Sequence, residues 1–107
     1  MNKQNKNDFF DILRKIDKNP RESQRVLAKE LDISLGKLNY CLKALKEKGF
    51  IKIQNFKKNK NKLGYVYLLT PKGVTEKTIL TFKFMERKLK EYDELKSEYE
   101  KIQRNKK

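Results

Sequence analysis

Apolar residues recur along the first half of the chain at the three- and four-residue spacing of amphipathic helices. The first such stripe runs from residue 8 to residue 16, and Asn7 or Asp8 is available as its N-cap. The next stripe lies in residues 23–31, where the Ser23 hydroxyl can accept a hydrogen bond from the first turn. The two patterns predict two short helices in succession.

A third helix is expected to begin after the N-cap Ser34 and to end before Gly49, because glycine often follows the last helical residue. Cys41 lies on the apolar side of this helix, so we expect it to be a buried core residue. The alternative is a redox-sensing thiol, which requires a more exposed position. A turn of about three residues separates the second and third helices, which is the spacing of a helix-turn-helix.

The pattern changes after the third helix. Residues 50–56 and 65–70 are rich in Ile, Tyr, Val and Leu with partial alternation, which predicts the two strands of a β-hairpin. The segment between them carries four basic residues, Lys57, Lys58, Lys60 and Lys62. We expect this segment to project as a loop that is too charged to close tightly without solvent or an anionic partner. A helix-turn-helix followed by a basic hairpin predicts a winged helix-turn-helix domain over residues 8–70.

The rest of the chain predicts one long helix. Thr70 and Pro71 form a favourable helix start, and no proline after Pro71 interrupts the helix expected over residues 71–104. A helix of this length spans roughly 50 Å and is too long for the small domain before it to bury. The predicted fold is therefore mainly α, with a small β-hairpin wing and a long C-terminal dimerisation helix.

An apolar series runs along this C-terminal helix at spacings of three and four residues, which resembles a coiled-coil seam. Its members are Phe82, Met85, Leu89, Tyr92, Leu95, Tyr99 and Ile102. We expect these side chains to form a homodimer interface. Two successive three-residue steps interrupt the heptad, so both a coiled coil and a short helical bundle remain open. The alternative to a dimer is a C-terminal helix that folds back on the winged helix-turn-helix domain of the same chain, which we call the head.

The outward side of the third helix is the predicted DNA-binding surface. Its inner positions are apolar, so a step of 100° per residue places a different set of side chains outward or on the flanks. Together with the N-cap, the expected contacts are Ser34, Gly36, Lys37, Asn39, Tyr40 and Lys43. Glycine lets the helix backbone approach a partner closely, and the other residues supply donors to phosphates or base edges near the helix N-terminus. The wing lysines are expected to add contacts to the DNA backbone.

Charge supports a polyanionic partner. The chain has 28 Lys and Arg against 14 Asp and Glu, a net charge of +14. Residues 86–107 hold eight basic and six acidic side chains, so +12 of that charge lies in the first 85 residues. Part of the lysine excess fits an AT-rich coding sequence, but its concentration before residue 86 favours nucleic-acid binding by the head.

The composition argues against an enzyme. Histidine is absent and cysteine occurs once, which excludes a disulfide within one chain, a Cys/His zinc site and nucleophile pairs that use histidine. We expect no metal and no cofactor. No apolar stretch is long enough to span a membrane and the first seven residues are polar, so a cytoplasmic protein without membrane contact is expected.

Three segments of the sequence resemble the MarR superfamily. They are residues 34–45 (SLGKLNYCLKAL), 47–51 (EKGFI) and 67–73 (YLLTPKG). More narrowly, they resemble the short members of the superfamily that are called EPS-associated regulators, after exopolysaccharide, and the first segment is fairly specific to that group. The resemblance implies a dimeric winged-helix transcriptional regulator near genes for exopolysaccharide or surface-carbohydrate synthesis. The chain is shorter than a typical MarR protein, which leaves an effector ligand at the dimer interface undetermined.

The leading hypothesis is a sequence-specific regulator that binds double-stranded DNA as a homodimer. A basic RNA- or ribosome-associated protein is the first alternative, although no RNA-binding motif of the RNP or GXXG type is present. The second alternative is a coiled-coil adaptor whose head binds protein.

Overall fold

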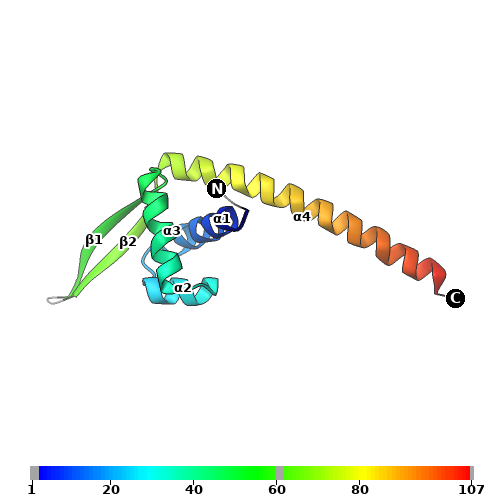
Figure 1. Ribbon diagram of the computed structural model, residues 1–107. Helices are drawn as coiled ribbons and strands as arrows, with labels where there is room; N and C mark the ends of the chain where they lie inside the picture. Colours follow the sequence, from blue (N-terminus) through cyan, green and yellow to red (C-terminus); the bar gives the residue numbers. More distant parts are fainter. Residues whose placement is uncertain (1–2, 60–61, 107) are drawn as a thin grey trace. The chain divides into compact units, whose positions relative to one another are not determined.

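The computed structural model describes residues 3–59 and 62–106, and it divides into two compact units that meet between Lys77 and Thr78. The elements of the chain are α1 (Lys3–Lys18), α2 (Gln24–Leu31), α3 (Leu35–Glu47), β1 (Ile51–Asn59), β2 (Lys62–Leu69) and α4 (Pro71–Asn105) (Figure 1). The first unit contains everything up to the first turns of α4, and the second is the rest of that helix. The prediction of a mainly helical winged helix-turn-helix with a hairpin and a long C-terminal helix is confirmed.

The first helix begins earlier than the apolar stripe indicates. α1 starts at Lys3, so Asn7 and Asp8 lie inside it, and the expectation that one of them is the N-cap is wrong. The added turn is polar and contains neither glycine nor proline, so nothing in it stops the helix from extending beyond its apolar face. Asp8 is instead a buried residue of the helix, 7% exposed.

Both predicted serine caps are confirmed. The Ser23 hydroxyl accepts a hydrogen bond from the backbone N–H of Val26 at 3.2 Å, and the Ser34 hydroxyl accepts one from Lys37 at 3.0 Å. Asp32 ends α2 in the left-handed conformation (φ 55°), which aspartate tolerates better than most residues. These caps make the turn between α2 and α3 short, as a helix-turn-helix requires.

A single apolar core holds the head together. Its members come from α1, α2, α3 and both strands: Phe9, Phe10, Ile12, Leu13, Ile16, Leu27, Ala28, Leu38, Cys41, Leu42, Leu45, Ile51 and Tyr67. The predicted burial of Cys41 is confirmed, since it is fully buried. Burial also raises the pKa of the Cys41 thiol, which keeps it protonated and unreactive near neutral pH.

The hairpin is longer than predicted. β1 and β2 pair antiparallel from Ile51–Leu69 out to Asn59–Lys62, so most of the segment expected to be a loop is strand backbone. The expectation of an open loop across residues 57–62 is therefore wrong. Two paired strands can continue on backbone hydrogen bonds alone, and a shift in register lies between Lys57 and Asn59. The residues at the turn itself, 60–61, lie outside the described residues.

The start of α4 is fastened to the exit of α3. The Thr70 hydroxyl donates to the carbonyl oxygen of Gly49 at 2.5 Å and accepts from the backbone N–H of Gly73 at 3.0 Å, which confirms its predicted capping role. The Lys72 ammonium donates to the Lys48 carbonyl oxygen at 2.9 Å. Two of the sequence segments that resemble the MarR superfamily thus form one structural joint.

The second unit is a continuous helix from Thr78 to the end of α4, and the seven apolar side chains of the predicted seam are exposed. The exposed fractions are 67% for Phe82, 55% for Met85, 51% for Leu89, 60% for Tyr92, 66% for Leu95, 60% for Tyr99 and 64% for Ile102. Within the described residues, none of the helices combines the length and apolar character needed to cross a membrane.

Candidate nucleic-acid interface

The outward face of α3 has the predicted composition. Tyr40 is 64% exposed, and Ser34, Asn39 and Lys43 are exposed as well. Gly36 is also exposed, and a Cβ atom added there would meet nothing within 4 Å. This chain itself therefore gives no steric reason for a glycine at that position, although glycine costs up to about 1 kcal/mol relative to alanine inside a helix. Close approach by a partner is a physical reason for it.

Lys37 occupies a different environment from the rest of this set. Its ammonium lies 2.9 Å from the Oδ2 atom of Asp8 in α1, and only 8% of the Asp8 side chain is exposed. The lysine is thus held against the α1 side of α3, where its charge is partly neutralised. Among the cations predicted on this helix, Lys43 is the one that stands exposed near the centre of the outward face.

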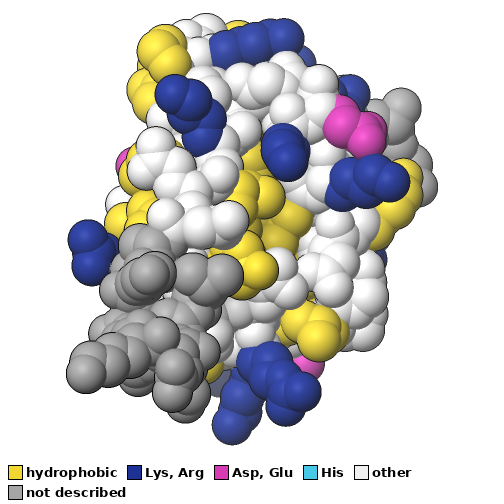
Figure 2. All heavy atoms as spheres, turned by 90° about the vertical axis from the view of Figure 1, so that its left-hand side faces the viewer, with side chains coloured by type: hydrophobic (Ala, Val, Ile, Leu, Met, Phe, Trp, Pro, Cys, Tyr) yellow, Lys and Arg dark blue, Asp and Glu magenta, His cyan; other side chains and the backbone are white. Residues whose placement is uncertain are grey.

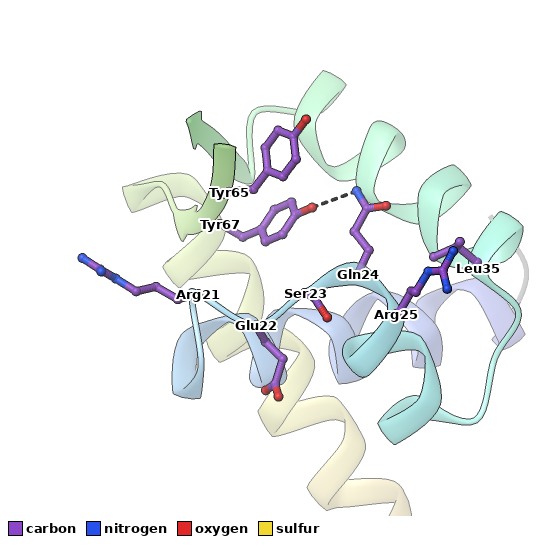
Figure 3. Close-up of a pocket in the computed structure, with 9 residues that line it drawn as sticks. Arg21, Glu22, Ser23, Gln24, Arg25, Leu35, Tyr65 and Tyr67 are labelled. Atoms are coloured by element: carbon purple, nitrogen blue, oxygen red, sulfur yellow. Dashed lines mark hydrogen bonds between the residues drawn. The ribbon is translucent and has the colours of Figure 1, made fainter. Parts of the chain in front are cut away.

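A groove of about 420 Å³ opens beside the other flank of α3 (Figure 3). It is lined by Arg21, Glu22, Ser23, Gln24 and Arg25 around the start of α2, by Leu35 at the start of α3, and by Gly64, Tyr65 and Tyr67 of β2. Figure 3 shows Arg21 and Arg25 at opposite ends of this row, with Arg25 beside Leu35, while Glu22 points away from the two tyrosines. The groove therefore joins all three elements of the winged helix-turn-helix.

Tyr67 fixes the hairpin to the start of α2. Its backbone N–H donates to the Pro20 carbonyl oxygen at 2.9 Å, and its hydroxyl accepts a hydrogen bond from the Gln24 amide at 2.8 Å (Figure 3). Burial raises the pKa of the Tyr67 phenol, and the hydrogen bond from Gln24 offsets part of this effect. The phenol stays neutral at physiological pH, so the floor of the groove is polar but uncharged.

The surrounding surface is basic. Figure 2 shows the side of the head that faces left in Figure 1, where Lys and Arg side chains surround exposed apolar patches and acidic side chains are sparse. Two arginines at the N-terminus of a helix present both their own charge and the positive end of the helix dipole. Such a surface favours the phosphates of a nucleic acid.

The wing lysines are only partly described. Lys57, Lys58 and Lys62 lie in strand backbone, and their side chains fall outside the described residues, as does all of Lys60. Their role in binding stays a prediction.

Sequence reasoning missed Arg21, Arg25 and Tyr65, of which Tyr65 is 49% exposed. Arg21 and Arg25 flank the predicted cap of the second helix in the sequence, and this position beside a helix N-terminus is the signal that could have identified them.

Comparison with known proteins agrees with this architecture. A family model described as winged helix-turn-helix DNA-binding matches residues 10–52, which include the second half of α1, α2 and α3. No curated protein is similar enough in sequence to count as a match.

Several solved structures share the fold. Staphylococcus aureus MarR in complex with salicylate and kanamycin matches with a TM-score of 0.60 and 23% identity over 80% of this chain and 56% of its own. Lactococcus lactis ZitR in its apo form matches with a TM-score of 0.64 and 23% identity, over 89% of this chain and 70% of its own. Streptococcus pneumoniae FabT in complex with DNA matches with a TM-score of 0.55 and 23% identity, over 78% and 58% of the two chains.

The chain spans little more than half the length of S. aureus MarR. The match covers 80% of this chain, however, and the family model covers its helix-turn-helix. The resemblance drawn from sequence motifs is confirmed at the level of the fold: this chain is a winged helix-turn-helix protein built like the MarR-type regulators.

Proposed function

We propose that this protein is a sequence-specific regulator of transcription that binds double-stranded DNA with α3 in the major groove. The observation that carries the proposal is the outward face of α3, where a glycine without a structural role in the chain stands beside an exposed Tyr40. The basic groove next to it supplies the electrostatic attraction. The complex of FabT with DNA supports the proposal, because that protein shares the fold.

In this arrangement the groove holds the DNA backbone. Arg21 and Arg25 neutralise phosphates beside the N-terminus of α2, and the exposed Tyr65 ring packs against a deoxyribose. Ser34 and Lys43 contact phosphates or base edges along α3. The function is binding, with no catalytic step, and a chromosomal regulator of this kind acts in the cytoplasm.

The protein acts as a homodimer held by α4. Seven apolar side chains along this helix are each at least half exposed in one chain, and a second copy is the partner that the periodicity of this stripe favours. Two-fold symmetry then presents two recognition helices to a palindromic site.

Target genes for exopolysaccharide or surface-carbohydrate synthesis follow from the family resemblance alone, and genome-wide mapping of bound sites tests that assignment.

A comparison of duplex DNA with a structured RNA of the same length, at one salt concentration, tests the function. We expect duplex DNA to bind more tightly, because α3 fits the wide major groove of B-form DNA and not the narrow one of A-form RNA. Equal or tighter binding to RNA would favour the basic RNA-binding alternative instead.

The wing should contribute phosphate contacts. Replacing Lys57, Lys58, Lys60 and Lys62 with Ala is expected to reduce the dependence of log affinity on log salt concentration by about 0.9 for each phosphate that these lysines neutralise. Replacing Lys96, Lys101, Lys106 and Lys107 of the C-terminal segment removes the same charge and serves as the control. Salt titrations by fluorescence anisotropy measure both slopes. A wing variant with the slope of the unmodified protein would exclude the wing from DNA binding.

Gly36→Ala is expected to raise the stability of the protein and to lower its affinity for DNA. We expect the free energy of unfolding to rise by about 0.5 to 1 kcal/mol, because alanine favours helix and the added methyl group has open space. DNA affinity should nevertheless fall, since the methyl group keeps the backbone of α3 away from the groove floor. Urea denaturation and anisotropy titrations measure the two effects. Unchanged affinity would mean that no partner approaches this position.

A further inference from the structure

Two exposed apolar side chains lie on either side of the outward face in the first turns of α3. Leu35 is 40% exposed at the first position of the helix, and Tyr40 is 64% exposed little more than one turn later. Leu35 also lines the groove next to β2. Exposed apolar groups on a binding face need an apolar counterpart. In the major groove the C5 methyl group of thymine is the apolar feature that a base pair presents.

The polar side chains of this face also favour A·T base pairs. Asn39 is exposed on the flank that Leu35 shares, and an asparagine amide pairs with the N6 and N7 atoms of adenine. Guanine is read mainly by Arg or Lys. The sequence of α3 contains no arginine, and Lys37 is ion-paired with Asp8 at 2.9 Å. Lys43 lies two turns beyond Gly36, whereas the N-terminal residues of a recognition helix make most base contacts.

Resting on the proposed function, we propose that α3 reads A·T base pairs and that each half-site contains thymines whose methyl groups pack against Leu35 and Tyr40. Asn39 then pairs with an adenine in the same half-site. Gly36, which has open space around it, lets the first turn lie close enough to the bases for these short side chains to reach them. Arg21 and Arg25 of the groove hold the backbone independently of sequence, so discrimination comes from the face of α3, at whose edge Leu35 borders the groove.

The first experiment is selection by the full-length protein from a library of synthetic duplexes with a randomised central region. The expected result is two half-sites rich in A·T pairs. Enrichment of G·C pairs in the half-sites overturns the inference. Salt-dependent binding without any sequence enrichment also overturns it but leaves the DNA-binding function intact. Failure to retain any duplex would overturn the proposed function itself, so the two failures are distinguishable.

The second experiment asks whether methyl groups are read, since an A·T preference can also arise from DNA shape. Each thymine of the selected half-site is replaced in turn by deoxyuridine, which removes only the methyl group. We expect at least one replacement to weaken binding about three- to fourfold, the value of one buried methyl group.

Two variants test whether Leu35 makes the contact with the thymine methyl group. In Leu35→Ala the deoxyuridine penalty at one thymine should disappear. In Val26→Ala, which shortens a side chain of equal exposure (41%) that does not line the groove, the penalty should persist. Equal affinity for the thymine and deoxyuridine duplexes at every position overturns the methyl contact, as does a penalty that survives in Leu35→Ala together with Tyr40→Ala.

Discussion

A chain that ends at Lys90 is expected to be a monomer that binds a palindromic site at least about a hundredfold more weakly than the full chain. The truncation removes four of the seven exposed apolar side chains of α4, Tyr92, Leu95, Tyr99 and Ile102. Full burial of one such side chain contributes about 1.5 to 3 kcal/mol to the free energy of association. We therefore expect a small dimer interface to be unstable once four of these side chains are removed. Two linked half-sites bind far more tightly than one, which explains the expected loss of affinity.

Light scattering and anisotropy titrations measure the mass and the affinity. A point variant keeps the chain length constant: Leu95→Glu places a charge on the stripe and should dissociate the dimer, whereas Ser97→Glu places the same charge off the stripe and should not. A full-length chain that is monomeric at micromolar concentration contradicts the dimer, and the helix would then have another partner or cover its own head.

Gly73→Ala is expected to destabilise the head by about 3 kcal/mol, which lowers the melting temperature by roughly 12 °C or more. A Cβ atom at this position would overlap the carbonyl oxygen of Phe50 and lie 2.9 Å from its carbonyl carbon. Both are backbone atoms, and that oxygen accepts a hydrogen bond from the Thr70 N–H at 3.0 Å. The joint between α3 and α4 must therefore open to admit the methyl group.

Thermal denaturation followed by circular dichroism measures the effect. Gly36→Ala is the matched control, because the same substitution in open space should not lower the melting temperature. If Gly73→Ala melts at the temperature of the unmodified protein, the close approach of α4 to Phe50 is wrong. The joint would then not be the reason that the chain carries glycine there.

Local signals in the sequence predicted those features that depend on neighbouring residues. Ser23, Ser34 and Thr70 are caps because each hydroxyl reaches a backbone N–H three residues away. The burial of Cys41 follows from helical periodicity alone. The start of α1 was missed because its polar first turn carries no apolar pattern, and the length of the hairpin was missed because strands that pair through the backbone need no apolar alternation.

Features that depend on distant residues were not predictable in this way. The ion pair between Lys37 and Asp8 joins two helices separated by 29 positions in the chain, and no pattern in either helix indicates it. The groove is lined by Arg21 and Arg25 from around the start of α2 and by Tyr65 from β2, and the hydrogen bonds of Tyr67 to Pro20 and Gln24 hold these two segments together. Long-range contacts of this kind require the folded structure.

The most direct test of the account is a paired measurement on Tyr40→Ala: its affinity for a selected duplex and its melting temperature. Tyr40 is 64% exposed and contributes little to the core, so the melting temperature should stay within about 2 °C of the unmodified protein. The affinity should fall by about 1 to 3 kcal/mol, because the proposed function places this side chain at the DNA. An unchanged affinity with an unchanged melting temperature contradicts the central claim that this face of α3 binds DNA.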